Sequence, residues 1–361
     1  TGQGNGQGGR EHGQKADQLP GYRKLDVPAD RAHVAHVWGV DADSLPQPGR
    51  SAYEMLDTLG TAGGVRALLV IGSNVAVSAP RAGHVQERLG ALDFLAVADI
   101  FRSETAQLAD VVLPVAQWAE EEGTMTNLEG RVILRQRACD PPPGVWSDLE
   151  IIAGLAARLG YEQFFPSEPR QIFDELRRAS AGGVADYAGI SYERIIHENG
   201  VFWPCPDEAH PGTPRMFGER FGHADGLARF HATQQRPPAE EPDDAYPFYL
   251  ITGRVMNHYQ SGTQTRRVKE LNEAVPHAFV EIHPALARRY GIAEHDLVQL
   301  TTRRGTATFR ARLTTTIRLD TLFVPFHWGG DACVNRLTNP ALDPTSRMPE
   351  FKVCAVAIMQ L

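Results

Sequence analysis

Polar side chains directly follow two short apolar runs of this sequence. Gly72-Ser73-Asn74 comes at the end of RALLVIG (66–72), and Asp99 ends FLAVAD (94–99). Glycine lets a backbone approach a ligand closely, serine and asparagine offer hydrogen bonds, and a strand-end carboxylate accepts from a base or from ribose hydroxyls. The alternatives are a helix-capping turn at 72–74 and an ordinary N-cap at Asp99. No GxGxxG is present, which weighs against an NAD site.

The densest polar segment is TGRVMNHYQSGTQTRR, residues 252–267. An apolar run leads into it, and hydroxyl, amide, imidazole and glycine positions follow. Backbone amides and hydroxyls bind phosphate, while Arg254 adds positive charge. The segment therefore predicts a loop that binds a large phosphorylated ligand, with a polar surface loop as the alternative.

The C-terminal region carries another polar set. His327, Asn335 and Lys352 lie in PFHWGGDACVNRLTNPALDP and PEFK, although a solvated rim would have the same composition. The sequence contains no Ser-His-Asp order and no HExxH motif, and we expect the acidic run 120–122 to be a solvated face.

Alternating strands and helices are predicted to position the first of these segments. Apolar runs at 66–72, 94–99 and 110–114 are typical of buried parallel strands, and Pro80 predicts a helix through about Leu89. Ser147 and Glu150 form a capping box that opens a helix closing at Gly160. We expect an α/β domain over 1–202, an open parallel sheet that binds a dinucleotide beyond the carboxyl ends of its strands.

A junction and a β domain follow. Residues 203–245 are rich in proline, glycine, histidine and acidic residues, as in QQRPPAEEPDDAYP. A mostly β barrel is predicted over 246–361, with one helix at Pro284–Tyr290 and a hairpin turn at Arg304–Gly305. Its six predicted strands are Phe248–Thr252, Ala278–His283, Leu297–Thr302, Thr306–Leu313, Thr321–Pro325 and Phe351–Met359.

Composition narrows the class of protein. The 361 residues suggest two or three domains, and 42% hydrophobic with 22% charged residues is typical of a globular chain. A net charge of −8 weighs against a nucleic-acid partner. No apolar run approaches the ~20 residues that a membrane span requires.

The four cysteines form no CxxC pair, and we expect reduced structural thiols in a cytoplasmic protein. The chain opens at Thr1 within a glycine-rich motif. We therefore expect a fragment whose N-terminal portion is missing.

Taken together, these segments resemble the molybdenum bis(molybdopterin guanine dinucleotide) oxidoreductases of the DMSO reductase family, which include nitrate reductases and formate dehydrogenases. The resemblance covers nearly all of the chain and weakens between about 165 and 245. It is carried by ADVVLP, GTMTNLEGR, SDLE, TGRVMNHYQSGTQTRR and NRLTNPALDPTSRMPEFKVCAV, in the family's order. The opening TGQGNGQGGREHG, followed by LPGYR, resembles the nitrate reductases, especially the assimilatory bacterial type. Formate dehydrogenases usually lack its Arg-Glu pair.

The resemblance implies a set of cofactor contacts and a barrel of the double-psi type. Arg10 and Glu11 match a pair near the substrate funnel, where a guanidinium orients an oxyanion. The implied dinucleotide contacts are Gly72, Ser73, Asn74, Asp99, Asp148, Thr252, Gly253, Arg254, His258, Ser261, Gly262, Thr263, His327 (or its neighbour Phe326), Asn335 and Lys352.

Two positions depart from the family pattern. Glu120-Glu121-Glu122-Gly123 stands where the family often has EKEG, so one basic contact is reversed in charge at Glu121. His295-Asp296 replaces the usual Gly-Asp strand-entry turn. The family's [4Fe-4S] cysteines and its molybdenum ligand belong to the N-terminal portion, so the resemblance gives this chain no metal ligand and predicts that it is inactive alone.

For the intact protein, the resemblance implies reduction of nitrate, or of another small anion, with electrons from a donor protein or domain. A formate dehydrogenase shares the cofactor and most of these residues. A non-catalytic scaffold homologue in an electron-transfer complex has no need of the polar site residues.

Overall fold

The computed structural model describes residues 5–361, which form two compact units. The first unit comprises the residues up to 50 together with 115–233, and the second comprises 51–114 together with 234–361. Residues 1–4 of the opening motif lie outside the described residues. The segments of the expected α/β domain are thus shared between both units, and the expected domain boundaries at 202 and 246 stay a prediction.

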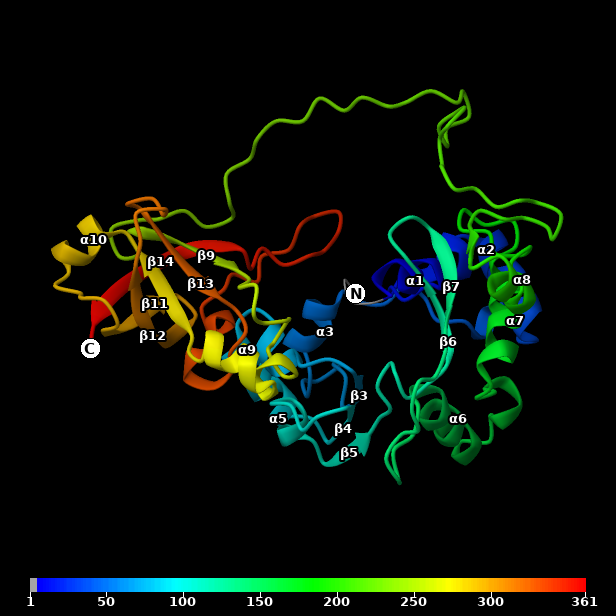
Figure 1. Cartoon of the computed structure of the whole chain (residues 1–361), viewed down its shortest axis with the longest axis horizontal. Helices are drawn as coiled ribbons and strands as arrows, with labels where there is room; N and C mark the ends of the chain where they lie inside the picture. The colour runs from blue at the N-terminus through cyan, green and yellow to red at the C-terminus, as the bar shows by residue number, and fades with distance from the viewer. Residues whose placement is uncertain (1–4) are drawn as a thin grey trace. The chain divides into compact units, whose positions relative to one another are not determined.

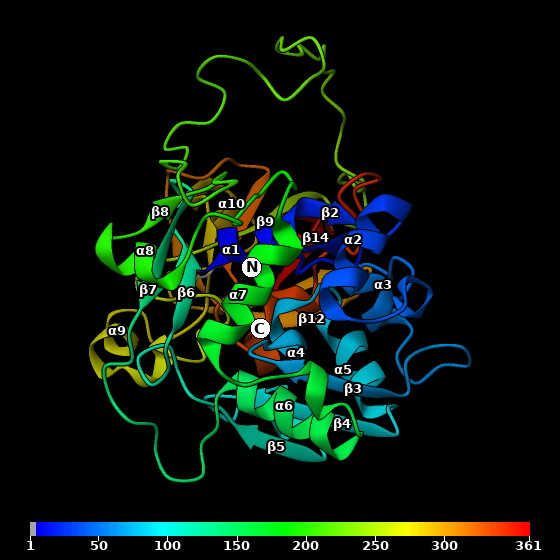
Figure 2. The ribbon, with the colours of Figure 1, turned by 90° about the vertical axis from the view of Figure 1, so that its right-hand side faces the viewer.

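The second unit contains a small parallel sheet. Strands β3 (Ala67–Ile71), β4 (Phe94–Asp99) and β5 (Val111–Pro114) lie side by side in that order, as Figure 2 shows. Its helices are α3 (Ala52–Asp57), α4 (Val75–Ser78), α5 (Ala82–Gly90) and the 3₁₀ turn η3 (Ala106–Leu108). Leu59, Val85, Leu89, Leu95 and Val97 are among the buried residues of its core. The predicted parallel pairing is confirmed. The central strand β4 is buried over most of its length, whereas most residues of the outer strands β3 and β5 are partly or fully exposed, so the expectation of burial holds for β4 alone.

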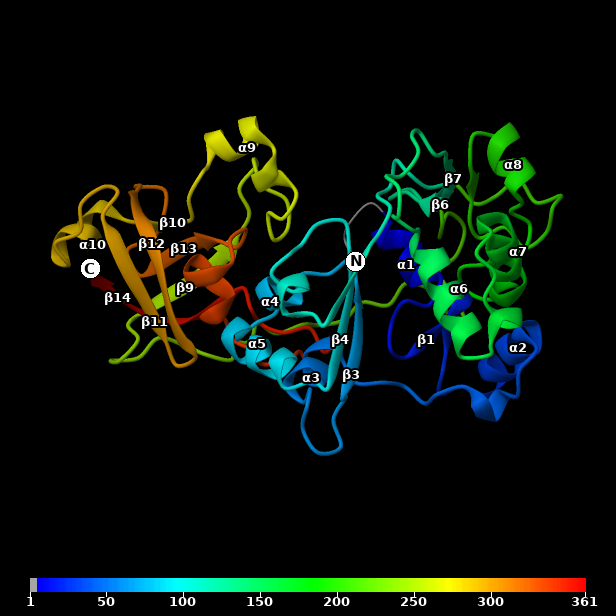
Figure 3. The ribbon, with the colours of Figure 1, turned by 90° about the horizontal axis from the view of Figure 1, so that it is seen from below.

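A closed barrel completes the second unit. Its strand order is β10-β12-β11-β14-β9-β13, which confirms the expected six-stranded barrel. The strands are β9 (Phe248–Gly253), β10 (Phe279–Ile282), β11 (Leu297–Thr302), β12 (Gly305–Leu313), β13 (Thr321–Pro325) and β14 (Val353–Gln360). Figure 3 shows the long β11–β12 hairpin, whose register pairs Thr302 with Gly305. The hairpin is confirmed, and its turn lies at Arg303–Arg304, one residue before the predicted Arg304–Gly305.

Short helical segments connect the barrel strands. They are η5 (Thr265–Arg267), α9 (Lys269–Ala274), α10 (Pro284–Arg289), η6 (Gly330–Ala332) and η7 (Val334–Arg336). The predicted helix at 284–290 corresponds to α10, and α9 was not predicted. The barrel interior is filled by alternate strand residues such as Leu250, Val298, Leu300 and Phe309, the two-residue period of a strand with one buried face.

The first unit contains helices and an antiparallel sheet. Its helices are α1 (Gly6–Glu11), η1 (Pro20–Tyr22), α2 (Pro28–Trp38), η2 (Ala42–Ser44), α6 (Asp148–Arg158), η4 (Glu162–Phe164), α7 (Pro169–Ser180) and α8 (Tyr192–His197). Its strands are β1 (Gln18–Leu19), β2 (Arg23–Lys24), β6 (Gly123–Thr126), β7 (Arg131–Arg135) and β8 (Val201–Phe202). Helices α7 and α8 lie beside the β6–β7 hairpin (Figure 1). The capping box of α6 is present as predicted, whereas the β6–β7–β8 sheet was not predicted.

Across residues 5–361, none of the helices combines the length and the apolar character that crossing a bilayer requires.

Candidate functional site

In the turn after β3, Gly72 is exposed to solvent, whereas the Asn74 side chain forms hydrogen bonds within the protein. Gly72 has a φ of +58°, and a Cβ placed there would meet no atom within 4 Å. Gly72 and Ser73 are exposed. Glycine adopts this left-handed conformation without strain. Because no atom lies close to the Gly72 Cβ position and both residues are exposed, a ligand can reach the backbone here. Asp99, at the end of β4, instead accepts a hydrogen bond from the Ser103 hydroxyl at 2.8 Å and thereby orders the following loop.

Asn74 connects the sheet to the loop that follows β9. Its carboxamide donates to Glu104 at 2.7 Å and to the Thr263 hydroxyl at 3.2 Å, and its oxygen accepts from the Thr105 backbone amide at 3.2 Å. Arg266 donates to the other Glu104 oxygen at 3.0 Å. Burial alone would raise the pKa of Glu104, but the hydrogen bonds from Asn74 and Arg266 outweigh it and hold the pKa below its ordinary value. This network fixes two expected contact residues, Asn74 and Thr263, relative to each other.

Glu104 and Arg266 were not among the residues predicted for the site. Both lie in segments that the sequence singled out, since Glu104 follows the Asp99 strand end and Arg266 lies in the 252–267 segment. Their pairing joins positions 162 apart in the chain. A sequence pattern has no means of showing such a contact, because local spacing carries no information about it.

His327 forms hydrogen bonds to the backbone of the loop between residues 253 and 265. It is completely buried, its Nε2 accepts from the Val255 amide at 3.0 Å, and its Nδ1 lies 2.6 Å from the Gln260 carbonyl oxygen. A neutral ring satisfies both contacts, with Nδ1 as the donor. Burial lowers the pKa of His327 to about 4, which keeps the ring neutral. Both ring nitrogens are thus used by the backbone of the loop.

His258 anchors the other side of the same loop. This side chain is buried, with Nε2 at 2.7 Å from the Val275 carbonyl oxygen and Nδ1 at 3.1 Å from the Thr265 hydroxyl. Gly262 has a φ of +71°, and an added Cβ would lie 2.4 Å from the His327 carbonyl oxygen. The loop therefore requires glycine at this position. Its backbone packs directly against that of His327.

Four further expected residues of the loop make contacts within the protein. The Thr252 hydroxyl donates to the Phe351 carbonyl at 3.0 Å. Gly253 packs on Phe323, whose ring a Cβ would approach to 2.6 Å. Ser261 and Thr263 share a hydrogen bond of 2.9 Å on the partly buried face of the loop. Their hydroxyls are thus already ordered.

Asn335 links η7 to the helix after the 72–74 turn. This buried carboxamide donates to the Val77 carbonyl at 2.8 Å, and Cys333 lies against the same oxygen at 3.6 Å. Burial raises the pKa of the Cys333 thiol to about 11. Asn335 therefore holds α4, which begins directly after Asn74.

Two cations lie close together near the start of the loop. Arg254 is 5.5 Å and Lys352 4.5 Å from the centre of the Phe326 ring. Neither forms an ion pair with any described residue. Burial, and then the charge of Arg254, lower the pKa of Lys352. Both side chains are exposed to solvent, and an anion bound near them would be attracted by two positive charges.

The first unit carries the remaining predicted residues. Asp148, in the first turn of α6, has a buried Oδ1 without a hydrogen-bond partner in the described part of the chain, and burial raises its pKa. Burial also raises the pKa of Glu121, although Arg135 donates to it at 3.1 Å and opposes the shift. The Glu121 side chain is 27% exposed, so the acidic run is less solvated than expected. Arg135 compensates locally for the charge that is reversed at Glu121.

Arg10 and Glu11 end the same helix but differ in exposure. Glu11 is 1% exposed and accepts hydrogen bonds from Tyr187 and from Gln7, the latter at 2.8 Å. Arg10 is exposed and forms no ion pair within residues 5–361. The guanidinium is therefore available to an anion, whereas the neighbouring carboxylate is committed to the interior.

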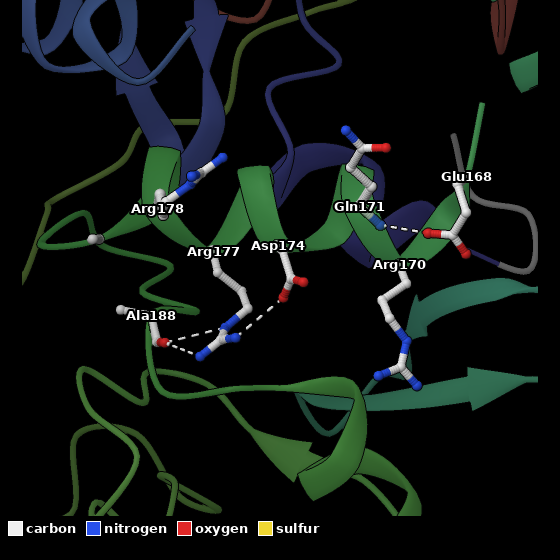
Figure 4. A pocket seen from close by; sticks show the side chains of 8 residues that line it. Glu168, Arg170, Gln171, Asp174, Arg177, Arg178 and Ala188 are labelled. Atoms are coloured by element: carbon white, nitrogen blue, oxygen red, sulfur yellow. Dashed lines mark hydrogen bonds and ion pairs between the residues drawn. The ribbon is translucent and has the colours of Figure 1, made fainter. Parts of the chain in front are cut away.

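A pocket lies beside α7, and charged side chains that already have partners border it. Glu168, Arg170, Asp174 and Arg177 border it. As Figure 4 shows, Arg177 is directed to the Ala188 carbonyl and to Asp174, and its guanidinium is therefore already partnered. None of the residues predicted from the sequence borders this pocket.

Each unit, taken by itself, carries groups that could bind part of a ligand. In the second unit, Arg254 and Lys352 offer positive charge to an anion, and the backbone at Gly72 is open. In the first unit, the Asp148 Oδ1 lacks an N–H or O–H donor among the described residues. A dinucleotide offers phosphate oxygens, ribose hydroxyls and the N–H groups of a base. The residues of each unit therefore fit part of such a ligand. Within the described residues, no three metal-ligating side chains gather.

Sequence comparison identifies two family matches. Residues 4–158 match the Molybdopterin oxidoreductase family, and residues 248–355 match the Molydopterin dinucleotide binding domain. Both matches indicate the molybdenum bis(molybdopterin guanine dinucleotide) cofactor.

Individual relatives agree with these families. The assimilatory nitrate reductase catalytic subunit of Bacillus subtilis (strain 168) is 49% identical over 100% of this chain and 51% of its own length. The F420-dependent formate dehydrogenase subunit alpha of Methanocaldococcus jannaschii is 41% identical over 100% of this chain and 52% of its own length. The chain thus spans about half the length of these relatives.

The fold also matches a solved structure. Acetylene hydratase from Pelobacter acetylenicus aligns with a TM-score of 0.64 at 18% identity, covering 92% of this chain and 50% of that protein. At this identity the likeness concerns the fold alone. The family matches and the relatives show that the chain belongs to the molybdopterin oxidoreductases.

Proposed function

We propose that this chain is part of an enzyme that reduces nitrate to nitrite, and that it binds the two guanine dinucleotides of the molybdenum cofactor. The observation that carries the proposal is the 49% identity to an assimilatory nitrate reductase over the whole chain. The unpaired, exposed Arg10 supports it, because a planar guanidinium binds an oxyanion through two parallel hydrogen bonds.

The chain's own residues perform two tasks in this proposal. Arg254 and Lys352 neutralise phosphate charge on one dinucleotide, next to the loop that His327 and His258 hold in place. Asp148 accepts a hydrogen bond from a nucleoside donor in the first unit. When bound, the cofactor supplies the electron transfer, and the protein positions it and the substrate.

Arg10 orients the substrate. Nitrate carries one negative charge and three equivalent oxygens, so a fixed guanidinium holds it in one plane. The overall reaction consumes two electrons and two protons and releases nitrite and water. The electrons come from a donor protein or domain, and we place the enzyme in the cytoplasm.

Formate oxidation is the second candidate. The 41% identity to a formate dehydrogenase alpha subunit favours it, and formate is also a small planar anion. A non-catalytic scaffold is disfavoured by the buried Asp148 Oδ1, which has no hydrogen-bond partner among the described residues, because an unsatisfied buried polar atom destabilises a protein that has no ligand for it.

Separate activity assays with nitrate and with formate distinguish the two reactions. The intact natural enzyme, shown to contain molybdenum, is supplied with nitrate and a reduced dye, and separately with formate and an oxidised dye. Nitrite formation without formate oxidation supports the proposal. Formate oxidation without nitrite formation replaces it by the second candidate.

A further inference from the structure

Helix α1 (Gly6–Glu11) cannot be stable by itself. It has six residues, three of which are glycine, in the sequence GQGGRE. Each helical glycine costs about 1 kcal/mol relative to alanine, and isolated helices shorter than about 12 residues are marginal in water. The contacts of α1 with the rest of the first unit must therefore determine where Arg10 lies.

A chain of hydrogen bonds holds both ends of this helix. At its start, the Asn5 side chain accepts from the Thr126 backbone amide at 2.9 Å. At its end, the Tyr187 hydroxyl donates to Glu11. The Thr126 and Tyr187 hydroxyls lie 2.7 Å apart and connect the two anchors. Because Tyr187 has a single hydroxyl proton, which goes to Glu11, the Thr126 hydroxyl is the donor to Tyr187.

Tyr187 is itself rigidly placed. It is 1% exposed, and its backbone amide donates to the Ser180 hydroxyl at 3.2 Å. The preceding Asp186 accepts from the amides of Gly182 and Ala188, at 2.7 and 2.9 Å, and fixes the turn. Burial, and then the charge of Glu11, raise the pKa of Tyr187, so the hydroxyl remains a proton donor.

The same cluster leaves one positive charge on this segment. Burial lowers the pKa of His12 to about 4, so the ring is neutral at pH 7 and packs edge-on against Tyr187 with ring centres 5.8 Å apart. Among residues 5–13, Arg10 is then the single cation. An anion approaching this segment meets one guanidinium, carried by a helix whose ends are fixed.

We propose that Tyr187 and Thr126 are positioning residues, which act through Glu11 and Asn5 to hold Arg10 where it orients the anionic substrate. This inference rests on the proposed function and deepens it. It assigns the orientation of the substrate to a buried cluster whose Tyr187 lies 176 residues along the chain from Glu11.

The test uses the intact, molybdenum-containing enzyme. Tyr187→Phe removes the hydroxyl and keeps the ring. Tyr192→Phe is the matched control, since Tyr192 is 2% exposed in the same unit and its hydroxyl has no hydrogen-bond partner among the described residues. Thr126→Val removes the hydroxyl that donates to Tyr187 and keeps the backbone amide that donates to Asn5, and Thr126→Ser restores the hydroxyl.

Three readouts are expected to agree. Tyr187→Phe and Thr126→Val raise the KM for nitrate roughly tenfold with little change in kcat, while Tyr192→Phe and Thr126→Ser do not. Amide hydrogen exchange across residues 6–12 is faster in Tyr187→Phe than in Tyr192→Phe. In an Arg10→Ala background, Tyr187→Phe has no further effect on KM, because it acts through the missing guanidinium.

Each contrary result has a distinct meaning. Unchanged hydrogen exchange in both Tyr187→Phe and Thr126→Val overturns the anchoring. An equal rise in KM with and without Arg10 shows that Tyr187 does not act through that residue. If the parent enzyme forms no nitrite while exchange responds as expected, the proposed function fails and the assignment of nitrate positioning fails with it.

Discussion

Asn74 donates a hydrogen bond to Glu104 at 2.7 Å and thereby joins the turn after β3 to the loop after β4. The same carboxamide reaches Thr263, which lies 189 positions away in the loop that follows β9. One side chain therefore connects the parallel sheet to the barrel within the second unit. A residue expected to contact a ligand also organises the surface to which that ligand would bind.

Replacing Asn74 by alanine is expected to destabilise the second unit. The change removes one of the hydrogen bonds to Glu104, which keeps the bond from Arg266, and leaves the Thr105 backbone amide without its acceptor. An unsatisfied buried group costs about 1–3 kcal/mol of unfolding free energy. Urea unfolding of the chain measures the loss. Asn272→Ala on α9 is the matched control, since no hydrogen bond of the Asn272 side chain is present in the described structure. Equal stability of the two variants would contradict the bridging role of Asn74.

The Glu104 carboxylate predicts an acid-dependent stability. Its folded pKa lies below the ordinary value of 4.5, so its stabilising contribution is complete above that pH and is lost as pH falls through the folded pKa. Glu104→Gln removes the charge. The difference in melting temperature between parent and variant should therefore shrink as the pH is lowered below 4.5. A difference that stays constant from neutral to acid pH would show that the charge of Glu104 contributes nothing.

The Lys352 side chain is expected to help retain the cofactor. Lys352→Gln removes one of two unpaired cations at Phe326, and a hydrogen bond to a charged group contributes about 1.5–3 kcal/mol. We expect roughly tenfold or greater weakening of cofactor binding, seen as less molybdenum per protein after dialysis of the intact enzyme. Lys269→Gln, on the exposed side of α9, should retain the parent's molybdenum content. The assignment is wrong if both variants retain it equally.

The Arg10 guanidinium is expected to determine the affinity for an anionic substrate. Arg10→Ala should raise the KM for nitrate by about ten- to a hundredfold, the range expected when a charged hydrogen-bonding group is lost. Arg215→Ala removes an exposed arginine of the same unit and should leave KM unchanged. Steady-state kinetics with both variants decide the matter. Unaltered KM and kcat in Arg10→Ala would remove this residue from the site.

The sequence predicts regular elements because their signals are local. Apolar runs such as RALLVIG and FLAVAD became β3 and β4, and the alternating strands around Gly305 became the β11–β12 hairpin. A period of two or a continuous apolar run reports directly on which faces are buried. The β6–β7–β8 sheet was missed because β6 (GTMT) lacks such a run, the apolar part of β7 is limited to Val132–Leu134, and β8, which pairs with β7, has two residues.

The site was less accessible to sequence reasoning because its contacts are distant along the chain. The expected residues His327 and Asn335 proved to be buried, with their polar atoms bonded to the backbone at Val255 and Val77. Whether they also touch a ligand stays a prediction. Glu104 and Tyr187 were missed because each acts on a partner that no local spacing links to it.

The measurement that tests the central claim most directly is nitrite formation by the intact natural enzyme with reduced viologen as electron donor. The account predicts one nitrite for every two viologen radicals oxidised, in a protein that contains molybdenum. Molybdenum-containing enzyme that forms no nitrite under these conditions, and instead oxidises formate, would contradict it.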